Sequence, residues 1–104
     1  MTDDSSAQES RMPRLILFVT GNAPRTQRAR RNLASMLEQI GRDDLVPYEI
    51  DLLQQPQEGL TYSVFATPSL LKTDDEHGGS LLYGDLSDVD RLHKFLADLA
   101  KSHA

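Results

Sequence analysis

The apolar run Leu15–Val19 ends at a break, Gly21–Pro24, and an amphipathic segment begins directly after it. This succession constrains the fold more than any other feature of the chain. An unbroken run of β-branched and aromatic residues is typical of a central strand covered on both faces. Apolar residues then recur on one helical stripe over Thr26–Ile40, with Thr26 as the expected N-cap. Apolar and polar residues alternate over Leu45–Leu53, which predicts a second strand. Strand, helix and strand within about forty residues predict a right-handed parallel crossover.

The second half of the chain predicts a short helix, a hairpin and a final helix. Their expected bounds are Gln54–Phe65 for the short helix, Thr67–Thr73 and Ser80–Tyr83 for the two strands, and Val89–Ala100 for the final helix. In the short helix, Leu60, Val64 and Phe65 form the expected apolar side. The expected N-cap of the final helix is Ser87, and the polar, glycine-containing Asp74–Gly79 suits a hairpin loop. The predicted order is β-α-β-α-β-β-α, an α/β fold.

The length of 104 residues predicts a single domain. Residues 1–12 are polar and acidic without apolar periodicity, so we expect a disordered tail there and the folded domain over residues 13–104. No apolar run approaches the roughly 20 residues of a membrane helix, and the acidic start does not resemble a signal peptide. We therefore expect a cytoplasmic protein without membrane contact. A formal net charge of −5 argues against nucleic acid as a partner.

The chain contains no cysteine, which excludes disulfides, thiolate metal sites and thiol catalysis. His77 stands beside acidic residues, but neighbours in one loop do not have the spacing of a metal site, and we expect none. No serine nucleophile stands in a recognisable motif with a histidine base. We expect no catalytic residue, no enzyme activity and no cofactor, so the function must be carried by the surface.

Four short motifs occur in order along the chain, namely Phe18–Pro24, Ile50–Leu52 with Gln55–Pro56, Ala66–Leu70 and Gly84–Ser87. Their order and spacing resemble the KaiB family of clock and stress proteins, over a stretch from about Arg14 to Leu99. One departure is Ala23, where the family has threonine. The resemblance implies a thioredoxin-like fold with a mixed sheet, helices on both faces and a cis peptide bond before Pro68.

The same resemblance implies a function. KaiB proteins bind the ring-shaped ATPase KaiC, so we expect a non-catalytic regulator of a KaiC-type ATPase that modulates its phosphorylation or its access to partners, in clock or stress signalling. A histidine kinase or another KaiC-associated protein is a further partner consistent with the resemblance. Clock-type members also switch to a tetrameric form with a different C-terminal half. Here the acidic Asp74–Gly79 and the helical stripe of Val89–Ala100 favour the thioredoxin-like form, as a monomer or dimer.

The motifs and the resemblance together give two sets of site residues. The expected structural residues are Gly21, Pro24, Thr67, Pro68, Gly84, Asp85 and Ser87. The expected partner-binding residues are Asn22, Arg25, Arg28, Gln54, Gln57, Glu58, Thr61 and Tyr62. We expect Arg28 and Arg31 to project into water, where they either serve binding or form a solvated face.

A second hypothesis comes from a different functional class. In thioredoxin-like domains the loop before the cis proline presents its backbone to a substrate. Thr67–Pro68 would then hold glutathione or another small thiol ligand, without redox activity. The free amides of residues 21–26 beside arginine also fit an anion, but no P-loop motif is present and a simple turn is expected.

Overall fold

The computed structural model describes residues 15–74 and 78–100. The elements are β1 (Leu15–Val19), α2 (Pro24–Gln39), β2 (Tyr48–Asp51), α3 (Pro56–Thr61), β3 (Ser69–Asp74), β4 (Gly78–Tyr83), α4 (Val89–Leu96) and a 3₁₀ turn, η1 (Ala97–Leu99). Their order confirms the expected β-α-β-α-β-β-α pattern. The predicted tail, residues 1–12, and residues 75–77 of the predicted hairpin loop lie outside the described residues.

The four strands form one mixed sheet in the order β2-β1-β3-β4. The strands β1 and β2 pair in parallel, with Phe18 opposite Ile50, as the predicted crossover requires. The strand β3 is antiparallel to both of its neighbours, and Leu70 lies opposite Leu17 on one side and Leu82 on the other. The sheet therefore has β2 and β4 at its edges.

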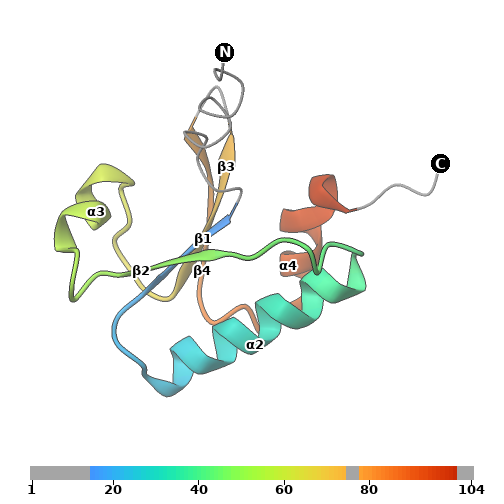
Figure 1. The fold of residues 1–104 in the computed structure, drawn as a ribbon, viewed down its shortest axis with the longest axis horizontal. Helices are drawn as coiled ribbons and strands as arrows, with labels where there is room; N and C mark the ends of the chain where they lie inside the picture. The colour runs from blue at the N-terminus through green and yellow to red at the C-terminus, as the bar shows by residue number, and fades with distance from the viewer. Residues whose placement is uncertain (1–14, 75–77, 101–104) are drawn as a thin grey trace, which may run out of the picture.

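Helices cover both faces of the sheet, as expected. Alternate residues of β1 point to opposite faces, so Leu15, Leu17 and Val19 pack with α2 and α4 in one core cluster. The intervening Ile16 and Phe18 belong to a second, smaller cluster on the side of α3. Figure 1 shows α2 and α4 together on one side and α3 apart from them. All five residues of β1 are buried because both of its faces are covered.

Both predicted N-caps are wrong. The helix α2 begins two residues before Thr26, with Pro24 in its first turn, and its N-cap Ala23 makes no side-chain hydrogen bond. A proline suits this position because it has no N–H to satisfy. The N-cap of α4 is Asp88, whose carboxylate accepts a hydrogen bond from the Arg91 N–H at 3.2 Å. Ser87 instead donates its own N–H to the Asp85 carboxylate, at 3.1 Å, and lies one residue before the cap.

The short helix α3 ends at Thr61, well before the predicted end at Phe65. Ser63 adopts a left-handed conformation with φ of 58°. Its N–H donates to the Leu60 carbonyl at 3.2 Å, and the Val64 N–H donates to the Gly59 carbonyl at 2.8 Å. This pair of hydrogen bonds is a Schellman motif, which ends a helix even when the left-handed residue is not glycine.

Candidate protein-binding surface

Three loops meet at one end of the sheet, and the side chains of Asp51, Thr20 and Thr67 hold them together. The Asp51 carboxylate accepts hydrogen bonds from the Gly21 N–H at 3.2 Å and from the Leu53 N–H at 2.9 Å. The hydroxyls of Thr20 and Thr67 hydrogen-bond to each other. We call this region, residues 20–23, 52–55 and 62–68, the loop end of the sheet. It contains parts of three of the four motifs that carry the family resemblance, namely residues 20–23, Leu52 with Gln55, and residues 66–68.

The loop end is also the place where strand β1 meets helix α2, opposite the peptide bond between Thr67 and Pro68, which is cis. The chain has no cysteine to place at this junction, where the hydroxyls of Thr20 and Thr67 hydrogen-bond to each other. Among residues 15–74 and 78–100, no group of three or more His, Cys, Asp or Glu side chains is placed to hold a metal ion.

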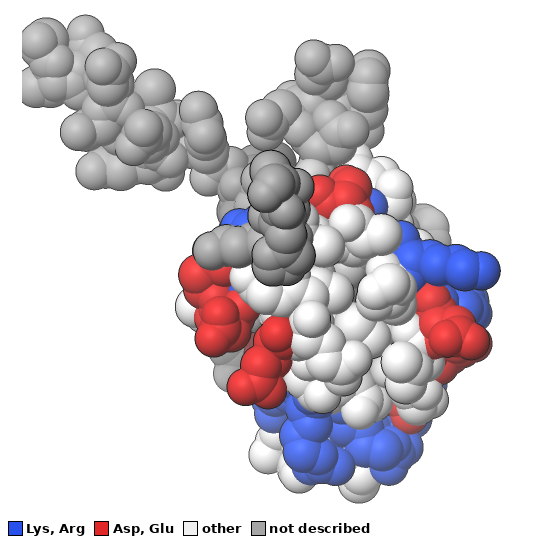
Figure 2. Space-filling model, turned by 90° about the vertical axis from the view of Figure 1, so that its right-hand side faces the viewer, with Lys and Arg blue, Asp and Glu red and all other residues white. Residues whose placement is uncertain are grey.

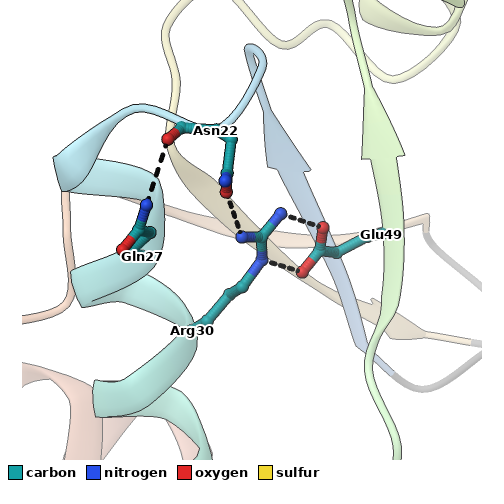
Figure 3. A network of polar contacts seen from close by, with 4 residues as sticks. All are labelled: Asn22, Gln27, Arg30 and Glu49. Atoms are coloured by element: carbon teal, nitrogen blue, oxygen red, sulfur yellow. Dashed lines mark hydrogen bonds and ion pairs between the residues drawn. The ribbon is translucent and has the colours of Figure 1, made fainter.

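Arg30 connects the loop end to the edge strand (Figure 3). Its guanidinium makes two hydrogen bonds to the Glu49 carboxylate of β2, at 2.6 and 2.9 Å, and a third to the Asn22 side-chain oxygen, at 2.6 Å. The hydrogen bond with Glu49 raises the pKa of Arg30 above its ordinary value. Gln27 donates to the Asn22 backbone carbonyl at 3.3 Å. Asn22 is therefore held from two sides, and sequence reasoning did not find Arg30 because its partner lies on a different element.

The predicted partner-binding residues of the second half gather on and around α3. Gln54, Gln57 and Thr61 are exposed, whereas Glu58 and Tyr62 are half-buried. The Tyr62 ring packs against Phe18 with ring centroids 5.4 Å apart, so most of this side chain serves the smaller core cluster.

The predicted residues on α2 lie apart from this group. Arg25 is exposed in the first turn of the helix. Arg28 and Arg31 are both exposed, as expected. Arg28 also has a partner that the sequence did not indicate, because its Nε lies 3.1 Å from the Asp85 Oδ2 in the connection after β4. Figure 2 shows basic side chains along the lower edge of one face, at the height where Figure 1 places α2, with acidic groups beside them.

Three large apolar side chains around α3 face solvent, and the sequence had assigned two of them to the interior. Leu60 is 80% exposed and Phe65 is 81% exposed, against 5% for Val64. Leu53, in the turn before α3, is 68% exposed. Residues 57, 60 and 61 share one helical face because they are three and four positions apart. We call Leu53, Gln54, Gln57, Leu60, Thr61 and Phe65 the α3 surface. The prediction that Leu60 and Phe65 pack inside is therefore wrong. Leu60 lies within α3, whose buried residue is Gly59, and Phe65 lies beyond the end of the helix.

The edge strand β2 adds a second feature to this side of the molecule. Among residues 15–74 and 78–100 it pairs only with β1, so its outer edge has backbone groups that no described strand uses and that can pair with another chain. Tyr48 is 53% exposed, and Val46 just before the strand is 84% exposed. The strand is four residues long instead of the predicted nine-residue segment Leu45–Leu53.

No helix in the part of the chain that the structure describes is long and apolar enough to cross a membrane.

The sequence is similar to several curated KaiB proteins, although no protein-family model matches the chain. The circadian clock oscillator protein KaiB of Nostoc sp. PCC 7120 is 36% identical over 78 residues, which is 75% of this chain and 71% of that protein. KaiB of Nostoc punctiforme is 36% identical over 75% of this chain and 74% of its own length. KaiB of Prochlorococcus marinus MIT 9313 is equally similar, and there the match spans 65% of the relative.

Solved structures show the same architecture. The N-terminal domain of SasA from Synechococcus elongatus superposes with a TM-score of 0.66 at 21% identity, over 86% of this chain and 85% of that domain. Deadhead, a germline-specific thioredoxin from Drosophila melanogaster, gives a TM-score of 0.65 at 18% identity, over 95% of this chain and 93% of its own. At these identities the likeness concerns the fold alone, and the fold is thioredoxin-like, as the resemblance implied.

Proposed function

Because this chain belongs to the KaiB family, we propose that it is a non-enzymatic regulatory protein that binds a KaiC-type ATPase. Binding would modulate the phosphorylation of the ATPase or its access to other partners, such as a histidine kinase. The ATPase supplies all the nucleotide chemistry, and this chain needs no cofactor. The observation that carries the proposal is the α3 surface, in which three large exposed apolar side chains and three exposed polar ones lie on α3 and the loops that flank it.

Exposed apolar side chains of this size favour burial in a complex. Removing a leucine or phenylalanine side chain from water contributes about 1.5 to 3 kcal/mol. Leu60 and Phe65 are among the most exposed large apolar side chains in the described ranges, 15–74 and 78–100. The exposed Gln57 and Thr61 beside them supply hydrogen-bonding groups, as the rim of a protein interface does.

The predicted residues would contribute to partner binding to different extents. Gln54, Gln57 and Thr61 lie on the α3 surface and would contact the partner directly. Asn22 would act through the loop that Arg30 holds against β2. The remaining predicted residues, Arg25, Arg28, Glu58 and Tyr62, would contribute at the margin, since they lie on α2 or are partly buried. In this proposal the thioredoxin-like form is the binding form, a monomer or dimer in the cytoplasm.

The experiment compares variants in their binding to a purified KaiC relative, with ATP and with ADP, by biolayer interferometry. Leu60→Ser and Phe65→Ser each remove an exposed apolar side chain from the α3 surface. Val89→Ser is the matched control, because Val89 is also exposed, at 58%, but lies at the start of α4. We expect the control to bind like the wild type and each α3 variant to bind roughly tenfold or more weakly.

Two outcomes would count against the proposal. Absence of binding to any KaiC relative with either nucleotide would remove the partner assignment. Equal binding by the α3 variants and the control would remove the α3 surface as the contact. Calorimetric titration with glutathione tests the alternative ligand, and a saturable heat there would favour the small-thiol hypothesis. We expect none, because membership of the KaiB family favours a protein partner over a small thiol ligand.

A further inference from the structure

A groove of about 490 Å³ lies between α2 and the segment that leads into β2. Its apolar lining comes from Leu17 of β1, Leu33 and Leu37 of α2, and Leu45 and Pro47 of the opposite segment. Cavities that hold small molecules in proteins have about 300 to 1,000 Å³ and are mostly apolar with a few polar groups. The groove is separate from the α3 surface, since α2 and α3 lie on different sides of the sheet (Figure 1).

The charged residues of the groove are unbalanced. Three carboxylates line it, those of Glu38, Asp43 and Glu49, against the single guanidinium of Arg30. Arg30 and Glu49 neutralise each other, with an Nε–Oε2 distance of 2.6 Å. The side chains of Glu38 and Asp43 have no hydrogen bond or ion pair to any residue that the structure describes. Two uncompensated carboxylates therefore stand at the end of the groove near the connection from α2 to β2.

We propose that this groove binds a small organic cation, an ammonium group carried on an apolar body. The ammonium would lie in the part of the groove that Glu38 and Asp43 line, where both carboxylates attract it. The apolar body would lie along Leu45 and Pro47, which are half-buried and so still offer apolar surface. A neutral or anionic ligand of the same shape would leave the two carboxylates unpaired.

The site also has a physical connection to the rest of the molecule. The far end of the groove is formed by Arg30 and Glu49, and the same Arg30 guanidinium holds Asn22 of the loop end. A cation bound at Glu38 and Asp43 would lie at the opposite end of the groove from the Arg30–Glu49 pair. This proposal concerns the groove alone and does not depend on binding to a KaiC-type ATPase.

Three probes of one shape test the charge requirement on the full chain, followed by amide chemical shifts in two-dimensional NMR. The probes are 4-phenylbutylamine, the neutral 4-phenylbutanol and the anionic 4-phenylbutyrate. We expect saturable shifts with the amine, at concentrations up to about 10 mM, in residues of α2 and of the segment after it. The amine should bind roughly tenfold more tightly than the alcohol, and this difference should shrink as salt is added.

Variants locate the site. Glu38→Gln and Asp43→Asn should each weaken the amine several-fold and leave the alcohol unchanged, whereas Asp90→Asn, an exposed carboxylate on α4, should change neither. Ala34→Phe should abolish binding of both, because Ala34 lines the groove from an exposed position of α2 where a ring can fill it without disturbing the core. Equal affinity for amine and alcohol, shifts outside the groove, or unchanged binding by Ala34→Phe would each overturn the proposal.

Discussion

Arg28 of α2 and Asp85 of the connection after β4 form an ion pair across 57 positions of sequence, with 3.1 Å between Nε and Oδ2. The same aspartate accepts a hydrogen bond from the Ser87 N–H at 3.1 Å, and its backbone carbonyl accepts one from the Asn32 side chain at 3.0 Å. Asp85 thereby joins the long helix to a connection in which Leu86 has a φ of +66°. This residue fixes the point at which the chain turns from the sheet into α4.

The first prediction concerns the pH dependence of this contact. Hydrogen bonding from Ser87 and then from Arg28 lowers the pKa of Asp85 to about 2. In the unfolded chain the carboxyl titrates at about pH 3.9, so its folded-state contribution is complete above about pH 4 and is lost as the pH falls toward 2. Asp85→Asn should therefore unfold more easily by about 1 kcal/mol at pH 7.

The measurement is urea unfolding of the wild type and Asp85→Asn from neutral to acidic pH. The two stability curves should converge as the pH falls through about 2, because the wild-type Asp85 carboxyl is then protonated and loses its charge. Arg28→Gln should lose stability at neutral pH too, and the double variant less than the sum. A stability difference that persists unchanged in acid would show that the charge of Asp85 is not its source.

The second prediction concerns Lys72, which fastens the end of the last helix to β3. Its Nζ donates to the Phe95 carbonyl at 2.7 Å and to the Asp98 carboxylate at 2.9 Å, and it lies 5.0 Å from the centre of the Phe95 ring. Lys72→Met should reduce the free energy of unfolding by about 1 to 2 kcal/mol. Lys94→Met, at an exposed lysine on α4, should have little effect.

Amide hydrogen exchange localises the effect of Lys72. In Lys72→Met the amides of the last turn of α4 and of η1 should exchange faster than those of α2, because the lost contacts hold only that end of the chain. Uniform acceleration over the whole sheet would contradict a local fastening role.

The third prediction separates packing from binding at Tyr62. Its ring packs against Phe18 at 5.4 Å between centroids and the side chain is half-buried. Tyr62→Ala should cost about 2 kcal/mol of stability, whereas Tyr62→Phe should keep it, since the ring is retained. Thermal unfolding checks both. A stable Tyr62→Ala that loses partner binding would mean that this tyrosine is mainly an interface residue.

The fourth prediction compares two glycines with positive φ. At Gly79, with φ of +132°, a Cβ would lie 2.2 Å from the Lys72 carbonyl oxygen, whereas at Gly84, with φ of +113°, it would meet nothing within 4 Å. Gly84→Ala should cost about 1 kcal/mol through backbone strain alone. Gly79→Ala should cost about 3 kcal/mol or more, because the β3–β4 pairing must open to admit the methyl group. Equal midpoints in urea would refute the steric explanation.

Hydrophobic periodicity predicted the elements well where the run was long. The unbroken Leu15–Val19 became the fully covered β1, and the stripe of the first helix became α2 with small errors at its start. The predictions failed at element ends. The alternation over Leu45–Leu53 continues beyond the four residues that pair with β1, because alternation indicates a strand-like pattern but not where a partner strand stops.

The candidate site was predictable only in part. The position of the loop end could be inferred from the motifs, but the exposure of Leu60 and Phe65 could not. A helical stripe assigns every apolar residue on it to the interior. In the structure α3 buries Gly59 and leaves Leu60 exposed, and the Schellman motif at Ser63 ends the helix before Phe65. Glu38 and Asp43 are likewise ordinary surface residues in the sequence, and only the groove between α2 and the next segment brings them together.

The amino-acid sequence by itself determined the order of strands and helices, the absence of thiol chemistry and, through four motifs, the family. These properties depend on composition and on spacing along the chain, both of which are local. Only the tertiary structure decided the partners of Arg28 and Arg30, which come from 57 and 19 positions away, and the surface left uncovered around α3. Contacts of this kind depend on where distant segments meet, and no local pattern encodes that meeting point.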